Sequence, residues 1–124
     1  MKIVEKYLVP DYLARSDEFI VDYMGPDGKE LMLCGFQEYV EGEILDPWSV
    51  LEKEKLASEM YDNLNRRNTS RPAMIKEGWI RCFERKGEKF IGRIKQMIAE
   101  TGYVPDLAGV GNLIIANSGK IKLV

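Results

Sequence analysis

Histidine is absent from this 124-residue sequence, and cysteine is scarce. Without histidine the chain cannot use Ser-His-Asp, Cys-His or HExxH chemistry, and it lacks the commonest transition-metal ligand. The two cysteines, Cys34 and Cys82, stand far apart among apolar residues with no CxxC spacing, so we expect buried thiols rather than a metal or redox site. Any chemistry must therefore rely on carboxylates, amides, hydroxyls or lysine.

The sequence also lacks a long apolar run and an excess of basic charge. No stretch approaches the ~20 apolar residues that cross a bilayer, and the first ten residues do not resemble a signal peptide, so we expect a cytoplasmic protein with no membrane partner. The 18 basic and 20 acidic residues are interspersed, so no basic face marks a nucleic-acid partner. Apolar residues make up 45% of the chain, enough for the core of one domain over residues 1–124.

The first 45 residues have the pattern of β structure. Short apolar and β-branched runs at residues 6–9, 19–24 and 31–40 are separated by turn residues, as is typical of strands. The sequence Gly-Pro-Asp-Gly at residues 25–28 favours a tight reversal. We therefore predict a β-hairpin between the second and third runs.

After residue 45 the apolar period becomes that of helices. Asp46 followed by proline favours a helix start, because the carboxylate can cap free amides and proline is tolerated at the first helical position. Leu56, Met60 and Leu64 then form one apolar stripe. The polar segment at residues 68–72 ends in proline and predicts a loop.

A second helical region is predicted from about residue 72 to residue 100. Gly87 lies in a polar stretch between two apolar patches, so we expect a kink or a break into two helices there. Gly102 is placed to end the helix.

The sequence closes with a second β signal. The runs at residues 112–116 and 120–124 flank Asn-Ser-Gly, which predicts another hairpin. The predicted class is α+β: antiparallel N-terminal strands within residues 1–45, then a helical lobe with a C-terminal β-hairpin within residues 46–124.

Two segments in this order resemble parts of protein kinases. Residues 36–42, FQEYVEG, resemble the hinge that joins the two lobes of that family. Residues 106–115, DLAGVGNLII, resemble the kinase catalytic loop, D-L-x-x-x-N-[IL]-L. The resemblance covers roughly residues 31–124. The long stretch between the two segments is similar to the small-molecule branch, such as aminoglycoside and lipopolysaccharide-core phosphotransferases.

The hinge resemblance implies a nucleotide-binding role. A backbone carbonyl and amide of Glu38 and Val40 would bind the adenine edge, with Gln37 as the gatekeeper residue. Ile114, on the first strand of the C-terminal hairpin, would form the apolar floor under the adenine. The implied cofactor is ATP.

The loop resemblance implies phosphoryl-transfer chemistry. Asp106 would be the catalytic carboxylate that orients the accepting hydroxyl, and Asn112 would ligate magnesium on the phosphates. The implied partners are a nucleotide and a small-molecule phosphate acceptor. The second metal carboxylate of the family would be the residue that follows Val124.

Several family features are missing from the sequence. Val104 and Pro105 replace the residues that usually precede the loop aspartate, and Asp106 lies six positions before Asn112, where the family spacing is five. Neither a glycine-rich loop nor a VAIK-like lysine precedes residue 36. We therefore expect a fragment or degenerate member of a kinase-like phosphotransferase family, inactive as the chain stands.

Two alternatives remain open at this point. The chain can instead be a non-catalytic protein-interaction domain that kept the scaffold, or an unrelated α+β domain of unknown function. Open sheet edges and apolar surface would favour self-association into a homo-oligomer.

Overall fold

The computed structural model describes residues 2–48, 52–67 and 72–124. In chain order the elements are α1 (Lys2–Leu8), β1 (Ser16–Gly25), β2 (Gly28–Gln37), β3 (Glu43–Ile44), α2 (Lys53–Arg66), α3 (Lys76–Thr101), β4 (Leu113–Ile115) and β5 (Ile121–Leu123). The strands form two antiparallel sheets, β1-β2 and β3-β4-β5. The predicted α+β class, with N-terminal antiparallel strands and a C-terminal hairpin, is confirmed.

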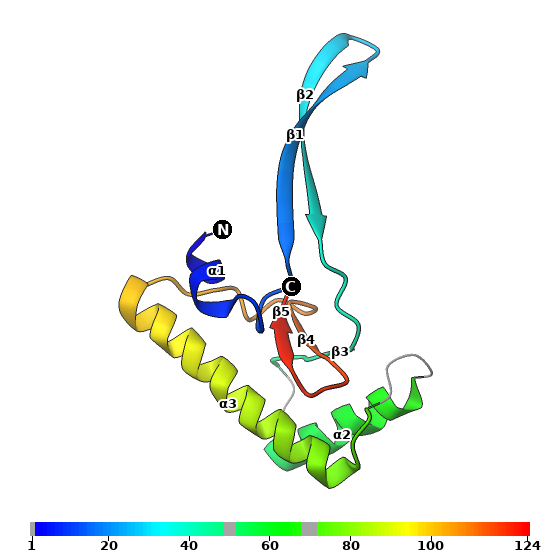
Figure 1. Ribbon diagram of the computed structural model, residues 1–124, viewed down its shortest axis with the longest axis vertical. Helices are drawn as coiled ribbons and strands as arrows, with labels where there is room; N and C mark the ends of the chain where they lie inside the picture. Colours follow the sequence, from blue (N-terminus) through cyan, green and yellow to red (C-terminus); the bar gives the residue numbers. More distant parts are fainter. Residues whose placement is uncertain (1, 49–51, 68–71) are drawn as a thin grey trace.

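The β1–β2 hairpin projects away from the rest of the chain. Figure 1 shows it as a long two-stranded ribbon, while the helices and the small sheet gather at its base. The strands pair from Ser16 with Gln37 to Gly25 with Gly28, so only residues 26 and 27 form the loop. Gly28 has a φ of 111°, which a residue with a side chain rarely adopts. The turn chemistry at residues 25–28 therefore fixes the hairpin where the sequence predicts it.

Helix α3 supplies one side of the apolar core. Its buried residues recur at helical spacing: Trp79, Phe83, Phe90, Ile94 and Met97. They pack against α1, α2 and the buried faces of β4 and β5, which gives one continuous cluster. The turn between β4 and β5 is tied to this helix, because the Trp79 indole nitrogen donates to the Asn117 carbonyl at 2.7 Å. Gly119, in the same turn, has a φ of 82°.

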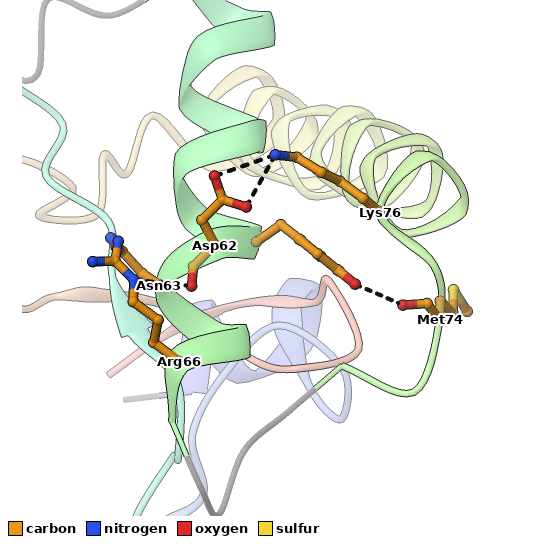
Figure 2. Close-up of polar contacts among 6 residues, drawn as sticks. Asp62, Asn63, Arg66, Met74 and Lys76 are labelled. Carbon is orange, nitrogen blue, oxygen red and sulfur yellow. Dashed lines mark hydrogen bonds and ion pairs between the residues drawn. The ribbon is translucent and has the colours of Figure 1, made fainter.

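Helix α2 is joined to the start of α3 by polar contacts (Figure 2). The Lys76 ammonium contacts both carboxylate oxygens of Asp62, at 3.0 and 3.2 Å. The Tyr61 hydroxyl donates to the Met74 carbonyl at 3.1 Å. These contacts join α2 to the residues at and just before the start of α3, and α2 buries Ala57, Met60 and Leu64 against the core.

The predicted break into two helices at Gly87 is wrong. Helix α3 runs unbroken through Gly87 over its full length of 26 residues and ends at Gly102, as predicted, where φ is 69° and the amide donates to the Ile98 carbonyl at 2.9 Å. A methyl group on Gly87 would lie 3.6 Å from the Ile121 side chain, so the glycine faces β5 across the core. Packing of the helix on this strand outweighs the ~1 kcal/mol propensity cost of an interior glycine.

Three expectations for the first half of the chain are corrected. Residues 6–9 do not form a strand, because α1 covers residues 2–8 and buries Val4, Tyr7 and Leu8. Asp46 does not cap a helix: its carboxylate accepts the Trp48 amide at 2.9 Å in a local turn, and α2 begins at Lys53. The strand expected at residues 31–40 ends at Gln37.

The remaining expectations concern thiols, a loop and the membrane. Cys34 and Cys82 are only half-buried, so the expectation of buried thiols is wrong. The predicted loop at residues 68–72 falls, apart from Pro72, outside the described residues. Within the described ranges, no helix has the length and apolar character that a membrane span requires.

Candidate functional site

Residues 38–42 run alongside the C-terminal hairpin. This segment leads directly into β3, where Glu43 pairs with Ile115 and Ile44 pairs with Ile114. A methyl group on Gly42 would lie 2.1 Å from the Ile115 carbonyl oxygen and 2.9 Å from the Ile114 side chain. Only glycine permits this approach, so Gly42 brings the backbone of the segment into contact with Ile114.

Glu38 ties the projecting hairpin to the small sheet. Its amide donates to the Arg15 carbonyl at 2.7 Å, and its carboxylate accepts the Arg15 amide at 3.0 Å. The other carboxylate oxygen accepts from the Lys122 ammonium at 3.1 Å. This pair is partly shielded, since the Lys122 side chain is 18% exposed and the Glu38 side chain 35%. Three segments therefore meet at one carboxylate.

These contacts lower the pKa of Glu38. The hydrogen bond from the Arg15 amide is the largest cause, and the Lys122 ammonium adds to it, because both stabilise the charged carboxylate. A folded-state pKa below the unfolded value means that the folded state binds this proton less readily than the unfolded state does. The stabilisation is therefore present above the ordinary glutamate pKa, ~4.3, and is lost as the pH falls through the lower folded value.

We expect Glu38→Gln to lower the free energy of unfolding at pH 7, and we expect the difference from the wild type to shrink as the pH falls below ~4.3. The neutral amide keeps a hydrogen-bond acceptor for Arg15 but loses the ion pair with Lys122. Urea unfolding followed by circular dichroism between pH 3 and pH 7 measures this dependence. Glu18→Gln, which removes an exposed carboxylate from β1, is the charge-matched control. If the free energies of unfolding of the wild type and Glu38→Gln differed by the same amount at every pH, the lowered pKa of Glu38 would be contradicted.

The loop from Asp106 to Asn112 is closed by its own hydrogen bonds. The Asp106 carboxylate accepts the amides of Ala108 and Gly109, at 3.1 and 3.2 Å, and the Asn112 side-chain nitrogen donates to the Asp106 carbonyl at 3.0 Å. The Trp48 indole nitrogen donates to the Ala108 carbonyl at 2.8 Å. Asp106 thus serves as a turn residue, and its position is fixed by the turn that it caps.

Asp106 and Asn112 line a pocket of about 240 Å³. Gln37, at the end of β2, and Val124 line the same pocket, so the two segments that resemble kinase motifs meet there. Glu5 of α1 contributes a second carboxylate, and no lysine or arginine is among the described residues of the lining. The pocket is therefore suited to a cation or a neutral polar group rather than an anion.

Glu38, Val40 and Ile114 lie outside this pocket. Val40 is buried, and Ile114 lies on the face of β4 opposite the core, next to Ile44. Asp106 and Asn112 thus share one pocket, whereas Val40 and Ile114 are apolar residues outside it and Glu38 is paired with Lys122. Among the described residues, no group of three or more acidic or cysteine side chains is placed to hold a metal ion.

Sequence reasoning missed the partner of Glu38. The alternation of residues 120–124 places Lys122 on the face of β5 opposite Ile121 and Leu123, both of which are buried. This alternation is visible in the sequence and was a usable signal for a lysine at the edge of the site.

No protein-family model, curated protein or solved structure matches this chain. The helices and the two antiparallel sheets define an α+β fold, and the function is argued from the contacts around residues 38–42 and 106–114.

Proposed function

We propose that this chain is the hinge and lower-lobe part of a kinase-like phosphotransferase, which binds the adenine end of a nucleotide without transferring phosphate by itself. The observation that carries the proposal is the contact of Gly42 with Ile114 and Ile115. It places the backbone at the end of the segment 38–42 beside an apolar side chain on the face of the β3-β4-β5 sheet opposite the core. A flat base needs these two features: backbone groups for its edge and apolar surface for its face.

The hydrogen bonds of Glu38 decide which backbone groups serve the base. Its amide donates to Arg15, so the groups that fit the adenine edge are the Glu38 carbonyl as acceptor and the Val40 amide as donor. The Glu38 carboxylate, held by Arg15 and Lys122, fixes the orientation of this backbone.

The pocket lined by Asp106 and Asn112 suits the phosphates of a nucleotide less well than residues 38–42 suit the base. The Asn112 amide nitrogen is used within the loop, which leaves its oxygen as the atom suited to magnesium, and Asp106 offers a carboxylate on the same pocket. Magnesium, when bound, would neutralise phosphate charge. Because no described lysine or arginine lines the pocket, a triphosphate gains little from it, and phosphotransfer is not expected of this chain alone.

We expect adenosine to bind about as tightly as magnesium-ATP, because the binding energy comes from the base rather than from the phosphates. Ile114→Ala should weaken adenosine binding by roughly tenfold, since it removes the apolar floor of the site. Isothermal titration calorimetry with each ligand measures both expectations. Ile91→Ala, an equal truncation at an exposed position of α3, should leave the affinity unchanged. Absence of adenosine binding at millimolar concentration, or equal affinity in wild type and Ile114→Ala, would overturn the proposal.

A further inference from the structure

The β1–β2 hairpin exposes apolar side chains on both of its faces. Ile20, Met24, Leu31 and Leu33 lie on one face, and Phe19 and Phe36 contact each other on the other face at a ring distance of 5.1 Å. Among the described residues this sheet has only two strands. An isolated two-stranded hairpin is marginally stable in water, and further strands are needed to stabilise it.

The two open edges of this hairpin differ in charge. Strand β1 carries three carboxylates, Asp17, Glu18 and Asp22, and no basic residue. Strand β2 contains the uncharged run Leu31–Phe36. Charged side chains are the usual means of preventing edge pairing, so β1 is protected while the edge of β2 is left open.

We propose that a second copy of this chain pairs with the open edge of β2. The two copies of β2 run antiparallel about a two-fold axis and form a four-stranded sheet in the order β1-β2-β2-β1. The acidic β1 strands then lie outermost, where their carboxylates stay in water. Pairing through β1 would instead line the contact with the carboxylates of both copies, and an axis at Ile20 would set Glu18 directly opposite Asp22 of the second copy, which is destabilising.

Charge also selects the register of this pairing. An axis through Lys29 or Glu30 would place each of these residues opposite its own copy. An axis through Met32 or Leu33 places Lys29 opposite Gly35 or Gln37 of the second copy, and it brings apolar residues opposite apolar residues. The geometry therefore points to a two-fold axis at Met32 or Leu33, in the middle of the uncharged run.

Sedimentation velocity from 1 to 200 µM tests the pairing. We expect a concentration-dependent dimer, and we expect Leu33→Lys to weaken it at least tenfold, because a lysine at the seam meets its own copy or apolar neighbours. Ile20→Lys is the matched control: Ile20 pairs with Leu33 inside the hairpin and has nearly the same exposure, 68% against 70%, but lies on the outer strand. This variant should dimerise as the wild type does.

Three results of this experiment would overturn the proposal. They are a monomer at every concentration, aggregates without a defined dimer, and equal weakening by Leu33→Lys and Ile20→Lys, which would indicate packing through the faces of the hairpin. The pairing needs no nucleotide, so its outcome is independent of adenosine binding.

Chemical cross-linking tests the register. Cys82→Ser leaves Cys34 as the single thiol. With the axis at Leu33 or Met32, the two Cys34 residues are offset by two or four positions, about 7 or 13 Å along the strands. A bismaleimide with an arm of about 13 Å should therefore link wild-type-like dimers of Cys82→Ser, and Leu33→Lys in the same background should abolish the link. Equal yields of the cross-link in Cys82→Ser with and without Leu33→Lys would contradict pairing through β2.

Discussion

Trp79→Ala is expected to lower the free energy of unfolding by ~3–5 kcal/mol. The Trp79 side chain is fully buried, its ring stacks on Phe83 at a centroid distance of 5.4 Å, and Tyr61 lies 5.6 Å from it. The substitution leaves a cavity and also strands the Asn117 carbonyl, which accepts the indole N–H. Because domains of this size are stable by only about 5–15 kcal/mol, the variant should be partly unfolded at 37 °C. Urea unfolding followed by circular dichroism measures the loss.

Trp48→Ala is the matched control for this prediction. Trp48 also donates its indole N–H to a backbone carbonyl, that of Ala108, but its side chain is exposed. Its loss should cost no more than ~1 kcal/mol, the net value of an ordinary hydrogen bond. If Trp48→Ala destabilised the chain as much as Trp79→Ala, the core would not be centred on α3.

Gly42→Ala should be the most damaging small substitution near the site, costing roughly 2–4 kcal/mol. The added methyl group would lie 2.1 Å from the Ile115 carbonyl oxygen, so β3 must move away from β4. That movement breaks the pairing of Ile44 with Ile114 and the hydrogen bond from the Leu45 amide to the Leu113 carbonyl. Hydrogen exchange of the Leu45 amide, followed by NMR, should accelerate together with the loss of stability.

Gly92→Ala provides the opposite control. Gly92 lies within α3, and an added methyl group has no neighbour within 4 Å. Alanine there should stabilise the chain by ~0.5–1 kcal/mol, because glycine is a poor residue for a helix interior. Unchanged protection of the Leu45 amide in Gly42→Ala would show that β3 does not need the close approach.

Local signals predicted the two hairpins, whereas distant contacts decided the elements that the sequence misplaced. The turns at residues 25–28 and 117–119 contain glycines that take positive φ, so their chemistry is readable from a few residues. The apolar run at residues 7–9 resembles a strand, whereas the buried residues Val4, Tyr7 and Leu8 have helical spacing and lie on α1. Gly87 faces Ile121, which lies far away in the sequence, and no local pattern shows this contact.

The candidate site also has one part that local sequence determines and one part that distant contacts determine. Asp106 and Asn112 share a pocket because one short loop, closed by its own hydrogen bonds, holds both. The ion pair of Glu38 with Lys122 joins residues 84 positions apart, and no local pattern couples them. The kinase-like roles of Glu38, Val40, Asp106, Asn112 and Ile114 remain predictions for the binding experiments.

The contacts of Glu38 hold the β1–β2 hairpin at one end and leave its other end projecting. Strands of ten residues extend about 34 Å from the fixed end to the turn at residues 25–28. A rotation of ~10° about the fixed end therefore displaces the tip by about 6 Å. The Glu38 carboxylate, which binds Arg15 and Lys122, lies at the fixed end of the hairpin. A small rotation that follows loss of the Lys122 contact therefore produces a larger displacement at the turn. The same few atoms that orient the backbone of residues 38–42 set the direction in which the far end of the hairpin points.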